Sequence, residues 1–131
     1  MTSILDHISL GVRDYDTAKR FYDQVLSTLG IVLIWEKPQM ASYGIGTDDH
    51  FGLQVDAGAA RGGTHLAFRA PDAASVVAFH AAALAAGGRD NGPPGLRPYS
   101  ESYYAAFVFD PDGNRIEAVF HGPTGSYASG L

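Results

Sequence analysis

The chain has no cysteine among its 131 residues, which excludes disulfide bonds, thiolate metal ligands and a cysteine nucleophile. Basic residues are also few: 9 Lys and Arg stand against 14 Asp and Glu, and the net charge is −5. An acidic surface offers no counter-charge to nucleic acid or to an anionic membrane, so neither is expected as a partner. With 46% hydrophobic and only 18% charged residues, the composition is typical of one compact folded domain.

Long apolar runs are missing as well. The longest, Val76 to Ala86, is broken by His80 and is far shorter than the ~20 residues that span a bilayer. No basic residue precedes Arg13, so no secretion signal is expected and the cytoplasm is the expected location. Gly92-Pro93-Pro94-Gly95 has neither the Walker lysine pattern nor the Rossmann spacing, and the chain has no serine nucleophile elbow.

The main feature that the sequence does contain is an internal repeat. The segment Asp6 to Leu10 aligns with Thr64 to Phe68, an offset of 58 residues (64 − 6). The same offset, without a gap, aligns a further set of residues with their counterparts: Asp14 with Asp72, Phe21 with Phe79, Leu26 with Leu84 and Gly30 with Gly88. Such a match across a strand, a helix start and a helix end indicates a duplicated unit.

Each copy predicts a strand followed by a helix. In the first copy, apolar residues alternate with polar or small ones from His7 to Val12, Asp14 or Asp16 can cap a helix, and Gly30 ends it. The buried face of this helix is expected to consist of Ala18, Phe21, Tyr22, Val25, Leu26 and Leu29. In the second copy Asp72 is the expected cap, and the corresponding face is Val76, Phe79, His80, Ala83 and Leu84.

Further strands follow each predicted helix. They are expected at Ile31 to Glu36, Met40 to Ile45 and Phe51 to Val55 in the first half, and at Tyr104 to Phe109 and Asn114 to Phe120 in the second. Asp110-Pro111-Asp112-Gly113 predicts a tight turn between the last two. The stretch from Arg89 to Ser102 has two interpretations, a lid over a cleft or an irregular strand.

The expected fold class is therefore α+β, with two βαβββ modules that form curved mixed sheets around a cleft. We expect a single domain over residues 1–131, made of module 1 (about 3–58) and module 2 (about 62–122), with a C-terminal tail at 123–131. The helices are expected on one side of the sheets, which leaves the other face free for a cleft.

Three polar residues stand at informative places on the predicted strands. His7 and His65 occupy equivalent positions of the repeat, and Glu117 lies inside the last strand, where glutamate is disfavoured. If the two sheets curve together, the three side chains can converge on the face away from the helices. Two imidazoles and one carboxylate suit one divalent Fe, Mn, Zn, Ni or Co ion with open coordination positions. The alternative is that each histidine is a hydrogen-bonded structural residue.

Other residues are candidates around this cleft. One of Tyr103 and Tyr104, with Tyr104 preferred, is expected to hydrogen-bond a substrate oxyanion, although both fit a role as sheet aromatics. His121 is either a second catalytic base or a solvated strand end. His80 is expected to pack on its helix, and His50 to lie in a solvated loop. The candidates for an anionic substrate group, which the sequence does not separate, are Arg61, Arg89, Arg97 and Arg115.

Several segments also carry a resemblance to a known family: Leu5 to Val12, the helix through Phe21-Tyr22 and Val25-Leu26, Gly63 to Phe68, and Asp110 to Glu117. They resemble the vicinal oxygen chelate superfamily, which includes glyoxalase I, extradiol dioxygenases, bleomycin- and fosfomycin-resistance proteins and methylmalonyl-CoA epimerase. The turn D-P-D-G-N-x-I-E is the most specific of these segments. The resemblance implies paired βαβββ modules and carries the role of metal ligand onto His7, His65 and Glu117.

The sequence departs from one pattern within that family. Glyoxalase I-like members use a fourth protein ligand, normally a glutamate on the fourth strand of the first module. Here that strand contains no acid between Phe51 and Val55, and Gln54 is the only side chain there that offers an oxygen. The remaining set of His, His and Glu resembles that of the extradiol dioxygenases.

We therefore expect a small metal-dependent enzyme, either a glyoxalase-like lyase/isomerase or an extradiol-type dioxygenase. Its substrate is expected to be a small molecule that chelates the metal through two adjacent oxygens, and Glu117 is the candidate for moving a proton. The resemblance also implies a homodimer, with a site either within one chain or across two. The alternative is a small-molecule or drug-binding protein of the bleomycin-resistance type, without catalysis.

Overall fold

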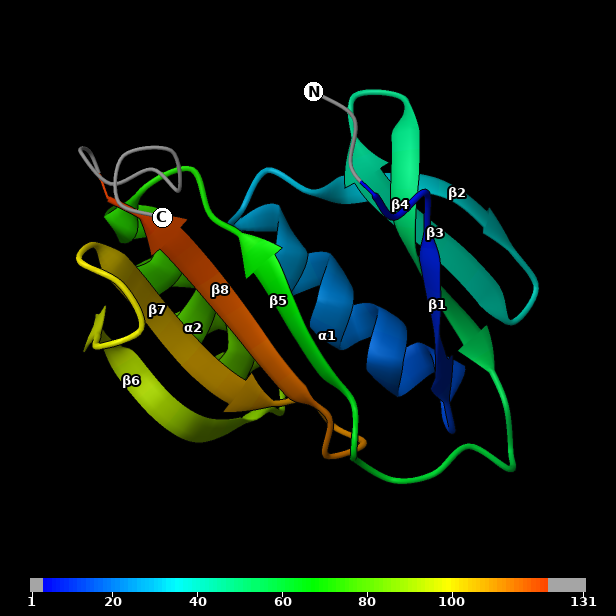
Figure 1. Cartoon of the computed structure of the whole chain (residues 1–131). Helices are drawn as coiled ribbons and strands as arrows, with labels where there is room; N and C mark the ends of the chain where they lie inside the picture. Colours follow the sequence, from blue (N-terminus) through cyan, green and yellow to red (C-terminus); the bar gives the residue numbers. More distant parts are fainter. Residues whose placement is uncertain (1–3, 123–131) are drawn as a thin grey trace.

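The computed structural model describes residues 4–122, so the predicted tail at 123–131 lies outside the described residues. The first module contains β1 (Ile8–Val12), α1 (Tyr15–Ser27), β2 (Val32–Lys37), β3 (Met40–Ile45) and β4 (Asp48–Val55). The second contains β5 (His65–Arg69), α2 (Ala73–Ala85), β6 (Arg89–Arg97), β7 (Tyr103–Phe109) and β8 (Arg115–His121). The order of elements confirms the predicted pair of βαβββ units (Figure 1).

Each module forms its own four-stranded mixed sheet. The strand orders are β1-β4-β3-β2 in the first sheet and β5-β8-β7-β6 in the second, which is the same topology twice. The first strand of each module runs parallel to the last one, and the other neighbours are antiparallel. The two sheets do not close into one barrel. Their edge strands β1 and β5 instead border an apolar groove that includes Ile8 and Leu66.

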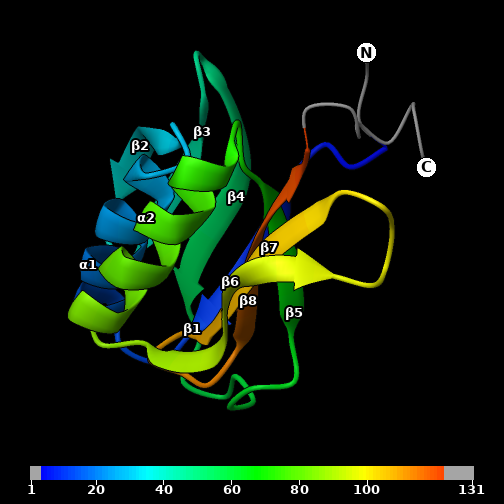
Figure 2. The ribbon, with the colours of Figure 1, turned by 90° about the vertical axis from the view of Figure 1, so that its left-hand side faces the viewer.

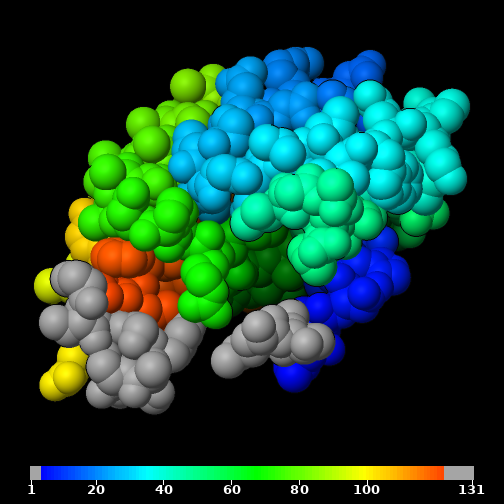
Figure 3. Space-filling view, turned by 90° about the horizontal axis from the view of Figure 1, so that it is seen from above, coloured from blue at the N-terminus to red at the C-terminus, as the bar shows by residue number. Residues whose placement is uncertain are grey.

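Both helices cover the same side of the sheets and pack against each other (Figures 2 and 3). Asp14 and Asp72 cap them as predicted, each accepting a hydrogen bond from the backbone N–H three residues later, Thr17 and Ser75. The predicted stripe of α1 is buried along its whole length. In α2 the prediction is wrong at one position, because Leu84 is 43% exposed. None of the helices in residues 4–122 is long and apolar enough to cross a membrane.

A buried polar contact joins the two modules. The hydroxyl of Tyr22 on α1 donates to Asp110 Oδ2 at 2.6 Å, in the turn between β7 and β8. That turn is closed as predicted: Gly113 has a φ of +87°, and its N–H donates to the Asp110 carbonyl. Asp110 Oδ1 also accepts the backbone N–H groups of Asp112 and Asn114, so its buried carboxylate is well satisfied.

The Gly- and Pro-rich stretch is a strand and not a lid, which settles the two interpretations of the sequence. From Arg89 to Arg97 it forms the edge strand β6, paired with β7. The register shifts twice, once on either side of Gly92. The second shift contains the two prolines at 93 and 94, which cannot donate hydrogen bonds to a regular ladder.

Candidate functional site

Three polar side chains from three strands meet on the open face of the second sheet, the face away from the helices. Glu117 of β8 is only 2% exposed, and its Oε1 accepts a hydrogen bond of 2.9 Å from Nε2 of His65 on β5. Its Oε2 accepts a hydrogen bond from the hydroxyl of Tyr103 on β7. A buried carboxylate needs such partners because its desolvation is otherwise uncompensated. The His65 side chain is 46% exposed, so the trio can be reached from solvent.

Strand alternation explains why these side chains share a face. Along β8, Ile116 and Ala118 are buried in the core, so Glu117 between them points to the opposite side. Glu117 is paired with Ala67 of β5, and His65 lies two residues before Ala67 on the same face. The sequence therefore brings His65 and Glu117 together through one parallel strand pair.

Tyr103 takes the position that sequence reasoning gave to Tyr104. Tyr104 is paired with Phe120, and both side chains pack against the hydrophobic core on the helix side. Tyr103 is one residue earlier and so lies on the open face. The tight turn already fixed this phase, because pairing Phe109 with Arg115 places odd-numbered residues of both strands on one face. The turn in the sequence was thus a usable signal for Tyr103.

His121 lies further along the same face. Its ring packs edge-on against that of Tyr103, with centroids 5.2 Å apart, and the residue is 6% exposed. Burial, and secondly the nearby charge of Arg69, lower the pKa of His121 below 6.5. At neutral pH its imidazole is therefore uncharged, the form that accepts a proton, and it is not the solvated strand end of the alternative prediction.

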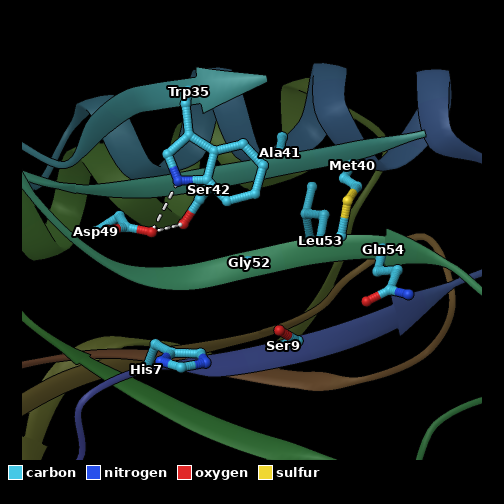
Figure 4. Close-up of a pocket in the computed structure, with 10 residues that line it drawn as sticks. All are labelled: His7, Ser9, Trp35, Met40, Ala41, Ser42, Asp49, Gly52, Leu53 and Gln54. Atoms are coloured by element: carbon cyan, nitrogen blue, oxygen red, sulfur yellow. Dashed lines mark hydrogen bonds between the residues drawn. The ribbon is translucent and has the colours of Figure 1, made fainter. Parts of the chain in front are cut away.

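The first sheet has a separate hollow of about 430 Å³ on its open face (Figure 4). Asp49 lies in its wall, and its Oδ2 accepts hydrogen bonds from the Trp35 indole at 2.9 Å and from the Ser42 hydroxyl at 2.8 Å. These two bonds, Ser42 first, hold the pKa of the Asp49 carboxyl below its usual 3.8. The hollow thus presents an ionised carboxylate beside an aromatic ring, a feature that sequence reasoning missed because it assigned residues 48–50 to a loop.

His7 belongs to this first hollow and not to the His65–Glu117 pair. It precedes β1, its side chain is 65% exposed, and its Nδ1 lies 2.8 Å from Asp6 Oδ2. Within residues 4–122, no three His, Cys, Asp or Glu side chains are placed to share a metal ion. Of the predicted ligands, one chain therefore brings together His65 and Glu117 but not His7, and does not by itself fit a three-ligand metal site.

The strand register also locates the place of the fourth ligand. In the second module Glu117 is paired with the residue two positions after His65. In the first module the residue two positions after His7 is Ser9, which is paired with Gly52. Gly52 is thus the structural counterpart of Glu117, and Gln54 lies two pairs further along, opposite Gly11. At the position equivalent to Glu117, the first sheet therefore offers no side chain to a metal.

The remaining histidines have local partners. The Nε2–H of His80 donates to Asp90 Oδ1 at 2.8 Å, which fits the expected packing role. His50 lies on β4 and not in a loop, and its Nδ1 contacts the Asp6 carbonyl oxygen at 2.7 Å. Neither side chain lines the hollow around Asp49 or contacts Glu117.

Comparisons with known proteins agree with this architecture. Residues 4–118 match the model of the Glyoxalase/Bleomycin resistance protein/Dioxygenase superfamily. A glyoxalase/bleomycin resistance protein from Albidiferax ferrireducens T118 is 35% identical, with a TM-score of 0.79 over 90% of this chain and 98% of that one. Two further structures share the fold. They are a lactoylglutathione lyase from Agrobacterium tumefaciens (23% identity, TM-score 0.66, 92% and 94% covered) and a fosfomycin resistance protein from Mesorhizobium loti (21%, 0.66, 95% and 97%). No curated protein matches the sequence.

Proposed function

Because the chain belongs to the Glyoxalase/Bleomycin resistance protein/Dioxygenase superfamily, we propose that it is a metal-dependent enzyme acting on a small molecule. The reaction would be a lyase or isomerase proton shift, or an extradiol-type oxygenation. The observation that carries the proposal is the buried Glu117 carboxylate, which His65 and Tyr103 hold on an open sheet face. A buried strand-interior acid costs stability, so its presence in that position favours a functional role for Glu117.

We further propose that the metal site is built from two copies of the chain. His65 and Glu117 would come from one copy and His7 from the other, since one chain leaves His7 on a different sheet. A symmetric homodimer repeats such a site twice. A divalent Fe, Mn, Zn, Ni or Co ion held there would supply Lewis-acid polarisation of two adjacent substrate oxygens.

The residues of this chain would then have separate tasks. Glu117 would accept a proton from the substrate, and Tyr103, which donates to the same carboxylate, would hold it in position. His121, whose imidazole is uncharged at neutral pH, would accept the proton next. Tyr103 lies between the two, with its ring against that of His121.

A mixing experiment tests the two-chain site. His7→Ala and Glu117→Gln are each expected to lose bound metal, measured by elemental analysis after reconstitution with each of the five ions. When the two variants are mixed and subunits exchange, half of the dimers are mixed and each has one intact site, so about a quarter of the wild-type metal should return. His50→Ala serves as the control, since His50 is not a proposed ligand and its ring is hydrogen-bonded to the Asp6 carbonyl.

The outcomes separate the possibilities. No recovery on mixing, with subunit exchange verified, would contradict a shared site. No metal bound by the wild-type protein with any of the ions would overturn the enzyme proposal. The second candidate, a non-catalytic small-molecule binding protein of the bleomycin-resistance type, would then lead. One observation favours that second candidate: the position equivalent to Glu117 in the first sheet is occupied by Gly52, which has no side chain to bind a metal.

A further inference from the structure

We propose that the ligand of this protein is a small organic anion, whose carboxylate or phosphate group binds to Arg97 and Arg115 on the open face of the second sheet. This inference deepens the proposed function, on which it rests for the choice of that face as the ligand surface. It adds the chemical class of the ligand, which neither the family nor the proposed metal site specifies.

The first observation is the distribution of charge. After Arg61 the chain contains four basic residues, and all of them lie on this face: Arg69, Arg89, Arg97 and Arg115. Arg89 and Arg97 stack on the rings of Phe109 and Phe107, and Arg69 and Arg115 alternate with core residues of β5 and β8. The acid that β5 to β8 place on this face, Glu117, already accepts two hydrogen bonds. Although the net charge of the protein is −5, the open face of the second sheet is therefore positively charged.

The second observation is that the backbone of β6 is shaped around the Arg97 side chain. Its Nη2 donates to the Pro93 carbonyl at 2.6 Å, and its guanidinium carbon lies 5.2 Å from the centre of the Phe107 ring. A Cβ at Gly92 would lie 3.2 Å from Nη2, and one at Gly95 would lie 3.2 Å from Nη1, so both glycines leave room for the guanidinium. Gly92 also has a φ of +148°, which favours glycine. The Gly-Pro-Pro-Gly segment thus forms a cradle for one arginine.

The arginine in this cradle is fixed without being neutralised. Carbonyl oxygens accept hydrogen bonds but carry no net charge, and among residues 4–122 no carboxylate lies within ion-pair distance of Arg97 or Arg115. The sequence candidate Arg61 differs, because it lies 4.0 Å from Asp112. A fixed guanidinium with free N–H groups is the arrangement that binds carboxylate or phosphate oxygens.

The third observation is the size and position of the space. Arg97, Arg115, Tyr99 and Phe107 line a hollow of about 300 Å³, which suits a small molecule and not a polymer. His65 lines the same hollow and contacts Glu117. A ligand with its anionic group on the arginines therefore extends toward the proposed reaction centre.

Anion titrations of the metal-free protein test the proposal. Inorganic phosphate and benzoate are titrated separately into chelator-treated, desalted protein by isothermal calorimetry at constant ionic strength. At least one of them is expected to bind saturably, and the preferred anion distinguishes phosphate from carboxylate ligands. Arg97→Gln and Arg115→Gln are each expected to weaken its binding about tenfold or more, because each removes charge-assisted hydrogen bonds.

Arg61→Gln is the matched control, since it changes the net charge equally outside the hollow, and less than about a twofold effect is expected. Arg115 is exposed, so Arg115→Gln is expected to fold and can test the proposal even if Arg97→Gln does not fold. Equal losses in all three variants, or no saturable binding of either anion, would overturn the proposal. The proposal would also be overturned if Arg97→Gln and Arg115→Gln bound the anion as tightly as the wild type. If these variants also dissociated the proposed dimer, the two arginines would be a subunit contact. Since no metal is present, these results are independent of the metal test above.

Discussion

The hydrogen bond between Tyr22 and Asp110 gives a sharp test of how the two modules are held together. Tyr22 is fully buried on α1, and Asp110 is 4% exposed in the turn before β8. Tyr22→Phe removes the hydroxyl that donates across this contact at 2.6 Å and leaves the ring volume unchanged. The substitution therefore measures one buried bond to a carboxylate without opening a large cavity.

The expected loss follows from the remaining partners of the carboxylate. A hydrogen bond to a charged group contributes about 1.5–3 kcal/mol. Asp110 keeps its bonds from Asp112 and Asn114, so a loss near ~2 kcal/mol is expected. With an unfolding entropy of ~2.1 cal/mol/K per residue, the chain has ~0.28 kcal/mol/K in total. The thermal midpoint should accordingly fall by ~7 °C.

Calorimetric melting with urea titration is the assay, and Tyr43→Phe is the control. Tyr43 also donates to an aspartate, Asp23 at 2.7 Å, but the side chain of Asp23 is 38% exposed and water can replace the hydroxyl. The free energy of unfolding of Tyr43→Phe should fall by about 1 kcal/mol or less. A smaller loss for Tyr22→Phe than for Tyr43→Phe would refute the reasoning that burial at the module junction strengthens this bond.

Three further predictions concern charge and close packing. Arg69→Gln should raise the pKa of His121 toward 6.5, measured by NMR of its imidazole protons, and an unchanged value would exclude Arg69 as a cause. Gly88→Ala would place a methyl carbon 2.8 Å from the Phe109 carbonyl oxygen, so urea unfolding should show a loss of about 1–3 kcal/mol; no loss would show that this contact relaxes freely. The bonds from the side chain and N–H of Ser75 hold the pKa of Asp72 below 3.8, so its stabilisation is present above pH 3.8 and is lost as the pH falls through the folded value. Asp72→Asn, which keeps the cap, should lose less stability than wild type during acid titration followed by circular dichroism; an identical acid profile would contradict this linkage.

Local signals predicted most of the fold correctly. The helix caps, the buried stripe of α1 and the turn at Asp110 depend on residues within a few positions of one another, and all are confirmed. The prediction that Leu84 is buried was wrong. The repeat aligns Leu84 with the buried Leu26, but the exposure of a side chain depends on what packs against each helix. The sequence left two interpretations of the stretch around Gly92, because a bulged edge strand has neither regular alternation nor a single turn signal.

The candidate site was only partly accessible from the sequence. Alternation and the repeat were enough to place His65 and Glu117 on one face, and the structure puts them in contact. The choice of Tyr104 over Tyr103 ignored the strand phase that the turn had already fixed. The sequence could not show which of the candidate arginines binds an anionic group. Only the path of β6 shows that the guanidinium of Arg97 lies in a cradle.

The sequence by itself therefore determined the two βαβββ units, the order of their elements and the faces on which the polar side chains lie, because periodicity and turns are local properties. Only the tertiary structure decided which of these faces meet. It separates His7 from His65, although their positions in the repeat are equivalent. The reason is that each sheet closes its hydrogen bonds within its own module, and the helices and the Tyr22–Asp110 contact then set the modules side by side.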